Sequence, residues 1–302
     1  MKSGMRGLLS AAVLLLLFSG AVLAGFEEGM VAVRRNDYAT ALKEWVPLAE
    51  QGNSNAQNNL GVLYEKGWGV PQDYVLAGRW YARAAEQGNA SAQNNLGVLY
   101  EKGLGLERNP ARAAQWYTSA ANRGDLNAQN NLGVLYERGI GVAQDTKAAL
   151  SWYRRAAEKG HKQAQNNLGV MYERGRGVAQ DNAIARDWYR RSADQDYAPA
   201  QNNLGVMYGN GAGVPADIVQ ANYWFTLSAA GGNPNGAQNR DNTSRRMTDA
   251  QRTEVEDLLA QRQAKLQVAP TPAVGAAAPK PAAVPASKPA APKPAAPRPQ
   301  PQ

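Results

Sequence analysis

The sequence predicts an all-α protein, an α-solenoid of five 36-residue helix–turn–helix repeats with capping helices at both ends. Two periodic series support this prediction. The heptapeptide Ala-Gln-Asn-Asn-Leu-Gly-Val begins at Ala56, Ala92, Ala128, Ala164 and Ala200. Tryptophan recurs with the same spacing, at Trp80, Trp116, Trp152, Trp188 and Trp224. A fixed period of this length is typical of stacked helical units, each of which buries its apolar face against the next.

Each unit is expected to contain two helices, named helix A and helix B. In the first unit, Ala56, Leu60 and Tyr64 form the apolar stripe of helix A. Gly67 follows at a position where a left-handed residue ends a helix. Asp73 is the predicted N-cap of helix B. Equivalent N-caps are Asp145, Asp181 and Asp217, with Asn109 before Pro110 in the second unit. Small residues such as Gly61 should let the two helices approach closely.

These residues resemble the Sel1-like repeat family, a branch of the tetratricopeptide-like superfamily. The resemblance lies in Ala-Gln-x-x-Leu-Gly-x-x-Tyr-x-x-Gly-x-Gly-Val followed by Ala-x-x-Trp-Tyr-x-x-Ala-Ala-x-x-Gly, and it covers about residues 26–247. It implies a right-handed superhelix with helix A on the concave side. It also implies an adaptor or scaffold, since the family is a set of such proteins with many partners.

The ends of the chain have different compositions from the repeats. Residues 1–24 are expected to be a secretory signal peptide, because a basic start precedes an apolar run. Val22 and Ala24 then provide small residues at the two positions that a signal peptidase reads. Residues 25–51 and 248–268 are predicted capping helices around the repeats of 52–247. Residues 269–302 are mostly Pro and Ala with four basic residues and no acidic one, which favours a disordered, extended tail. The mature protein is therefore expected to be periplasmic or secreted.

Composition argues against several classes of function. The formal charge of +8 comes largely from the two ends, since the middle of the chain holds 27 basic and 25 acidic residues, and this disfavours nucleic acid as a partner. Cysteine is absent and His161 is the single histidine. We therefore predict no catalytic, cofactor-binding or metal-binding residues, and no enzyme. Glu65, Glu101, Glu137 and Glu173 are interpreted as solvated helix ends.

The first candidate interaction surface is a row of asparagines. On a helical wheel, the first asparagine of each heptapeptide points away from the apolar stripe of helix A. The row comprises Asn58, Asn94, Asn130, Asn166 and Asn202. Amides offer both donors and acceptors, so the row could bind an extended peptide backbone or a glycan. In the alternative interpretation, the asparagines bond to their neighbours in adjacent units.

The second candidate surface is formed by the residues between the turn glycines. Trp68, Leu104 and Ile140 are large and apolar, and stacking would place them along one edge of the solenoid. Exposed apolar rows often mark partner sites. In the alternative, each side chain folds back onto the following helix B.

The function most consistent with this pattern is an exported adaptor that binds a protein, or a polysaccharide such as peptidoglycan, in the cell envelope. One alternative is a cell-wall-active or β-lactam-binding hydrolase, although no Ser-x-x-Lys motif supports it. Another is a structural protein that its basic Pro-rich tail holds at the cell wall.

Overall fold

The computed structural model describes residues 24–268, which contain helices and no strands. The signal peptide and the Pro-rich tail predicted above lie outside this range, apart from residue 24. A helical segment at 24–34 precedes α2 (Tyr38–Glu50). Five helix pairs follow, each an A helix and a B helix. They are α3 (Ser54–Lys66) with α4 (Tyr74–Glu86), α5 (Ala90–Lys102) with α6 (Pro110–Asn122), α7 (Leu126–Arg138) with α8 (Thr146–Glu158), α9 (Lys162–Arg174) with α10 (Asn182–Ala193), and α11 (Ala198–Asn210) with α12 (Ile218–Ala230). The last helices are α13 (Pro234–Ser244) and α14 (Asp249–Val268).

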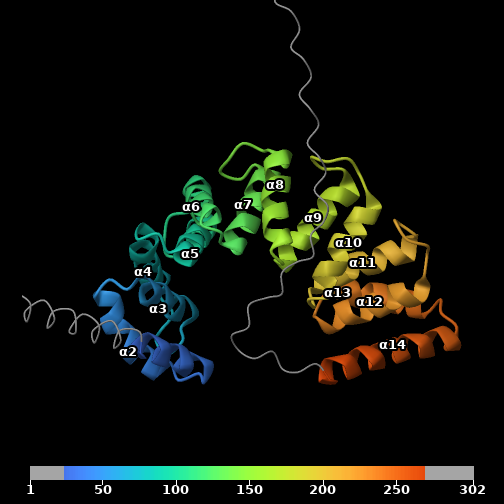
Figure 1. The fold of residues 1–302 in the computed structure, drawn as a ribbon, viewed down its shortest axis with the longest axis horizontal. Coiled ribbons are helices and arrows are strands. Elements are labelled where there is room, and N and C mark those ends of the chain that lie inside the picture. The colour runs from blue at the N-terminus through green and yellow to red at the C-terminus, as the bar shows by residue number, and fades with distance from the viewer. Residues whose placement is uncertain (1–23, 269–302) are drawn as a thin grey trace, which may run out of the picture.

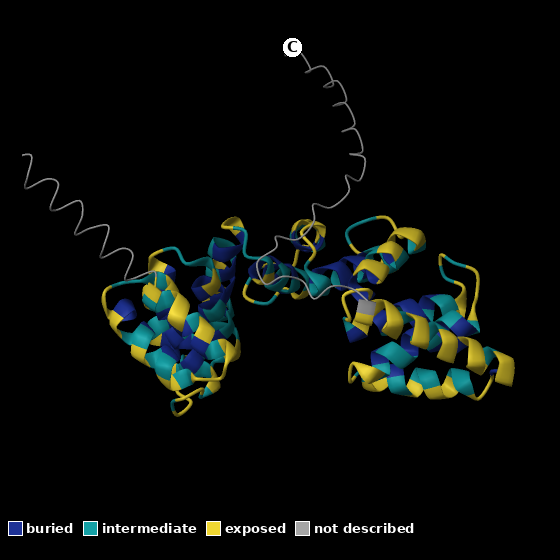
Figure 2. Ribbon diagram, turned by 60° about the horizontal axis from the view of Figure 1, so that its bottom comes forward, coloured by how far each residue is buried: buried dark blue, intermediate teal, exposed yellow. Residues whose placement is uncertain are grey.

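The helices form an arch, and most of them pack against the helices next to them in the sequence (Figure 1). Helices α3, α5, α9 and α13 lie toward the hollow of the arch, whereas α4, α6 and α10 lie on its outer side. Buried residues concentrate between the helices, and exposed residues on the loops and outer surfaces (Figure 2). The arch is the predicted α-solenoid, with the A helices on its concave side.

The predicted helix ends are confirmed. Gly67 ends α3 with a φ of 70°, a left-handed conformation that glycine adopts without steric cost. Asp73 caps α4 through a 2.9 Å hydrogen bond from the Leu76 amide, and Asn109 caps α6 before Pro110. These ends are local properties of the sequence, and they recur in every unit.

Within each unit, the two helices approach most closely where the glycine of helix A faces an aromatic ring of helix B. A Cβ atom at Gly61 would lie 2.5 Å from the Tyr81 ring, well inside contact distance. The equivalent ring in the fifth unit is Phe225, which lies against Gly205. The ring occupies the space that a larger residue would fill, so glycine is required for this spacing.

The glutamates near the ends of the A helices were interpreted from the sequence as solvated helix ends, and this interpretation is wrong. The Tyr81 hydroxyl donates to Glu65 Oε2 over 2.8 Å. The same bond recurs as Tyr117–Glu101, Tyr153–Glu137 and Tyr189–Glu173. Burial, followed by the charge and hydrogen bond of Glu65, raises the pKa of Tyr81 well above its ordinary value, so the hydroxyl remains a donor.

The fifth unit lacks both partners of this bond at once. Gly209 replaces the glutamate, and Phe225 replaces the tyrosine. A phenylalanine leaves no hydroxyl to satisfy, so the loss of the carboxylate leaves no buried donor without a partner. The paired change indicates that the two residues work as one structural element.

The glutamine of each heptapeptide joins one unit to the next. Gln57 donates to the Ala49 carbonyl at the end of α2, over 2.9 Å. The equivalent bonds run from Gln93 to Ala85, from Gln129 to Ala121, from Gln165 to Ala157 and from Gln201 to Ala193. Each of these carbonyls also accepts from the backbone amide three residues further on, so the glutamine adds a second hydrogen bond at the end of the preceding helix.

The two ends of the solenoid are covered by non-repeated helices. At the N-terminal end, Trp45 and Leu48 of α2 are buried. At the C-terminal end, Val255 of α14 packs with Val219 and Met247. Leu266, near the C-terminal end of the same helix, is 61% exposed.

The buried hydroxyl–carboxylate pair gives the first prediction. Tyr117→Phe should lower the free energy of unfolding by about 1–2 kcal/mol, because Glu101 loses a buried charge-assisted partner. Glu101→Ala alone should destabilise as well. In the double variant, the two effects should combine to less than their sum, with a coupling of about 1 kcal/mol.

The measurement is urea denaturation of the four proteins of this double-mutant cycle. Thr118→Val on the same helix, next to Tyr117, is a control that keeps the pair intact. Strictly additive effects would show that the hydrogen bond contributes nothing to stability.

Candidate protein-interaction surface

The heptapeptide asparagines form a ladder of hydrogen bonds between adjacent A helices. From the second unit onward, the second asparagine donates to the first asparagine of the unit before it. Asn95 donates to Asn58 Oδ1 over 3.1 Å, and Asn167 donates to Asn130 Oδ1 over 3.0 Å. The other three bonds run from Asn131 to Asn94, from Asn203 to Asn166 and from Asn239 to Asn202. The structure therefore contains the bonds between adjacent units that the alternative interpretation of this row described.

These bonds use only part of what the amides offer. Each amide has two N–H donors and two acceptor lone pairs. In a ladder bond, the second asparagine uses one donor and the first asparagine one acceptor. Asn58 also donates to Asn59 over 3.2 Å. Donors and acceptors remain on each pair, held in fixed orientations.

Exposure differs between the members of the ladder. Asn94 and Asn166 are buried, at 8% exposed, whereas Asn58, Asn130 and Asn202 are partly exposed. The second asparagines are partly exposed in every unit. They are Asn59, Asn95, Asn131, Asn167 and Asn203. These second asparagines were not among the predicted site residues, although they adjoin them in the same repeated motif.

The ladder is bordered by aliphatic and basic side chains. Val62 and its equivalents one helical turn away are partly exposed. Exposed Lys66 and Lys102 occupy the C-terminal ends of their helices, where a positive charge favours the helix dipole. The concave surface thus combines fixed amides with small apolar contacts, as suits an extended polypeptide.

The turn residues pack onto the preceding B helix, and not onto the following one as the alternative proposed. Trp68 stacks on Tyr38 at the start of α2, with ring centroids 5.3 Å apart, and remains 39% exposed. Leu104 and Ile140 are partly buried against the cores around α4 and α6. Of the three, Trp68 therefore offers the most exposed apolar surface.

His161 is the N-cap of α9. Its Nδ1 accepts a hydrogen bond from the Ala164 amide over 3.3 Å, and its Nε2 lies 3.1 Å from Asn127 Oδ1. Both contacts are satisfied when Nε2 carries the proton and the ring is neutral. Burial, followed by the charge of Lys162, lowers the pKa of His161. The helix cap therefore accounts for Nδ1, and the contact with Asn127 accounts for Nε2.

Residues 24–268 hold no group of three or more His, Asp and Glu side chains that could bind a metal ion. None of the helices in that range combines the length and apolar character of a membrane span.

The stacked helix pairs and the concave ladder define a helical-repeat protein of the interaction-scaffold class. The profile of the Sel1 repeat matches five consecutive segments, at residues 54–89, 90–125, 126–161, 162–197 and 198–233. The chain belongs to the Sel1 repeat family. Proteins with this fold generally mediate protein–protein interactions and are generally non-enzymatic scaffolds.

Solved structures of other proteins are similar to this chain, among them the following two. A Sel1 repeat protein from Oxalobacter formigenes is 38% identical, with a TM-score of 0.66, and the match covers 72% of this chain and 84% of that one. The protective antigen c5321 of uropathogenic Escherichia coli strains, which has an SLR fold, is 37% identical with a TM-score of 0.71. That match covers 80% of this chain but 54% of c5321, so the chain spans about half of that protein. No curated protein shows significant sequence similarity to this chain.

The histidine cap gives a prediction about pH. Because the pKa of His161 is lower in the folded protein than its ordinary value of 6.5, the unfolded chain binds the proton more readily. The contribution of this residue to stability should be complete above pH 6.5 and should be lost as the pH falls through the folded-state value.

His161→Asn places at this position the residue that caps the first two units, Asn53 and Asn89, and it cannot titrate. The urea midpoint of the unchanged protein should fall more between pH 7.5 and pH 5 than that of the variant. The additional decrease should correspond to the free energy of unfolding that one histidine with a lowered pKa contributes. Carboxylates titrate equally in both proteins, so the difference isolates His161. Parallel curves would contradict the role of the neutral cap.

Proposed function

We propose that this protein is an exported adaptor that binds an extended segment of an envelope protein along the concave side of the arch. The observation that carries the proposal is the ladder of oriented amides, which repeats once per unit across α3, α5, α7, α9 and α11 and reaches Asn239 in α13. Oriented amides can pair with the donors and acceptors of an extended main chain.

The energetic basis is preorganisation. The bonds between units fix the amide planes before a partner arrives, so binding does not have to order these side chains. Val62 and its equivalents add apolar contact beside each amide pair. A polypeptide fits this surface better than a compact ligand does, because the row extends over many units without a deep enclosure.

Export is supported by two further observations. The leader has the order of charge, apolar run and small residues that a signal peptidase reads. The first described residues, from 24 onward, are already helical, and Gly25 lies near Glu44 and Leu48 of α2. A chain cleaved after Ala24 would keep this N-terminal cap.

The adaptor proposal predicts partner loss on removal of the ladder. The triple variant Asn58→Ala, Asn94→Ala and Asn130→Ala should weaken capture of a protein partner at least about tenfold, since several hydrogen bonds of about 0.5–1.5 kcal/mol each are lost. The measurement is cross-linking and affinity capture of the tagged mature protein from intact cells, with quantitative mass spectrometry.

A matched control is available on the outer side of the arch. Arg79, Gln115 and Ser151 occupy one exposed helix B position in the same three units. Their alanine variants should retain the partner. Circular dichroism and urea denaturation establish that both triple variants are folded. Unchanged capture by a folded ladder variant would refute the concave surface as the recognition site.

The export proposal predicts a processed N-terminus. Expressed with its leader in a bacterium, the protein should be recovered from the periplasm or medium with Gly25 as its first residue, as intact mass would show. Ala24→Arg should block processing, because the peptidase requires a small residue there. Cytoplasmic retention of the unprocessed, unchanged chain would contradict export.

A further inference from the structure

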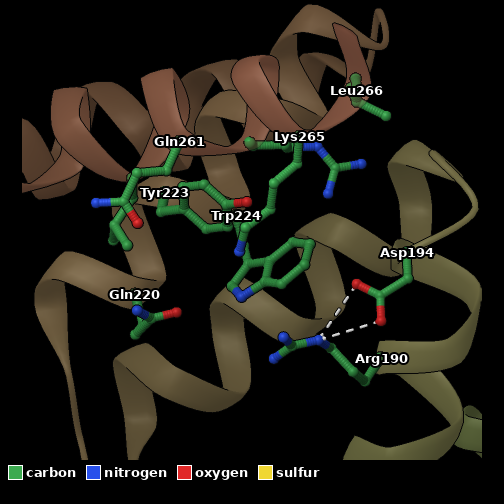
Figure 3. A pocket seen from close by; sticks show the side chains of 10 residues that line it. Arg190, Asp194, Gln220, Tyr223, Trp224, Gln261, Lys265 and Leu266 are labelled. Atoms are coloured by element: carbon green, nitrogen blue, oxygen red, sulfur yellow. Dashed lines mark hydrogen bonds and ion pairs between the residues drawn. The ribbon is translucent and has the colours of Figure 1, made fainter. Parts of the chain in front are cut away.

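A cavity lined by polar and aromatic side chains lies at the C-terminal end of the arch, between α10, α12 and α14. Its volume is about 360 Å³, and its walls come from three helices that are not consecutive (Figure 3). Trp224 and Tyr223 come from α12, Arg190 from α10, and Gln261 and Lys265 from α14. This volume falls in the range of sites that hold small molecules or single residues.

Trp224 differs from the other tryptophans of its series. The equivalent side chains of the first four units are partly exposed. Trp224 is 1% exposed, and its Nε1 is buried with no hydrogen-bond partner in the described structure. A buried donor without a partner is costly, so its presence beside a cavity indicates a place for an acceptor.

The charges around the cavity favour an anionic acceptor. Its lining contains three basic side chains, those of Arg190, Arg262 and Lys265, and one carboxylate, that of Asp194. The Arg190 guanidinium lies 5.0 Å from the Trp224 ring centroid and contacts both Asp194 oxygens at 3.3 Å. Arg262 pairs with Asp196 over 2.7 Å. Lys265 has no ion-pair partner within residues 24–268, and it reaches over the indole in Figure 3.

Apolar surface completes the site. The Trp224 and Tyr223 rings form one wall, in edge-to-face contact with centroids 5.0 Å apart. Leu258 and Leu266 contribute from α14, and Leu266 is 61% exposed. A ligand that matches all these groups needs an apolar part beside the rings and a carboxylate within reach of the indole N–H and Lys265.

We propose that this cavity binds an apolar residue with a free α-carboxylate, either as a small molecule or as the C-terminus of a peptide. The carboxylate accepts from Trp224 Nε1 and lies beside Lys265, while the side chain packs on Tyr223 and the leucines of α14. The site is separate from the concave ladder and does not depend on the adaptor proposal.

The test uses the mature chain labelled with ¹⁵N and follows the tryptophan indole N–H resonances during titration. The probes are N-acetyl-phenylalanine and its amide, which differ only in the carboxylate. The acid should shift the Trp224 resonance in a saturable way, and the amide should bind at least about tenfold more weakly because it lacks the charge. Trp224→Phe identifies the resonance. Through-space contacts to the Tyr223 ring identify it if that variant does not fold.

Lys265→Gln, at an exposed position, should weaken binding of the acid about fivefold, as expected for a partly exposed ion pair. Lys147→Gln, on the distant α8, should leave it unchanged. A tetrapeptide ending in phenylalanine that binds more tightly than the free acid would assign the site to peptide C-termini, and equal or weaker binding would assign it to small carboxylates. At roughly 10 mM acid, a site with a millimolar Kd would be close to saturation. The proposal fails if the Trp224 resonance does not move at this concentration, or if acid and amide bind equally.

Discussion

The close contact between a helix A glycine and a helix B ring sets the geometry of every unit. A Cβ at Gly97 would lie 2.7 Å from the Tyr117 ring, so the ring can lie flat beneath helix A only because that atom is missing. The same placement carries the Tyr117 hydroxyl to Glu101, 16 residues earlier in the chain. Packing and polar pairing therefore both depend on one absent methyl group, although the fifth unit keeps the packing of Gly205 against Phe225 without the polar pair.

Contacts between units repeat for the same reason. Once the helix pair has a fixed spacing, stacking brings Gln93 to the Ala85 carbonyl and Asn95 to Asn58. Both bonds are short-range in space but depend on the register of one unit against the next. Apolar packing alone tolerates small slips, whereas hydrogen bonds have narrow distance limits. The repeated polar residues thus fix the register of the stack, and the curvature of the arch follows from it.

Much of this architecture could be predicted from the sequence, because caps and stripes are local. Gly67 and Asp73 mark helix ends through their own backbone and side-chain chemistry. The bonds of Glu65 and of the asparagine ladder could not be assigned with the same certainty, because their partners lie 16 and 37 residues away and meet only after stacking. The burial of Trp224 depends on where α14 docks, and no feature of the repeat motif encodes that.

Repetition also limits what the concave surface can specify. A partner that contacts only the ladder meets an equivalent amide pair in each unit, so several registers have nearly the same binding energy. The non-repeated features lie at the two ends. Trp68 stacks on Tyr38 near the N-terminal cap, and Trp224 lies near Lys265 of the C-terminal helix α14. Discrimination between registers therefore has to come from residues that differ between units, and the two ends differ most in chemistry from the repeated surface.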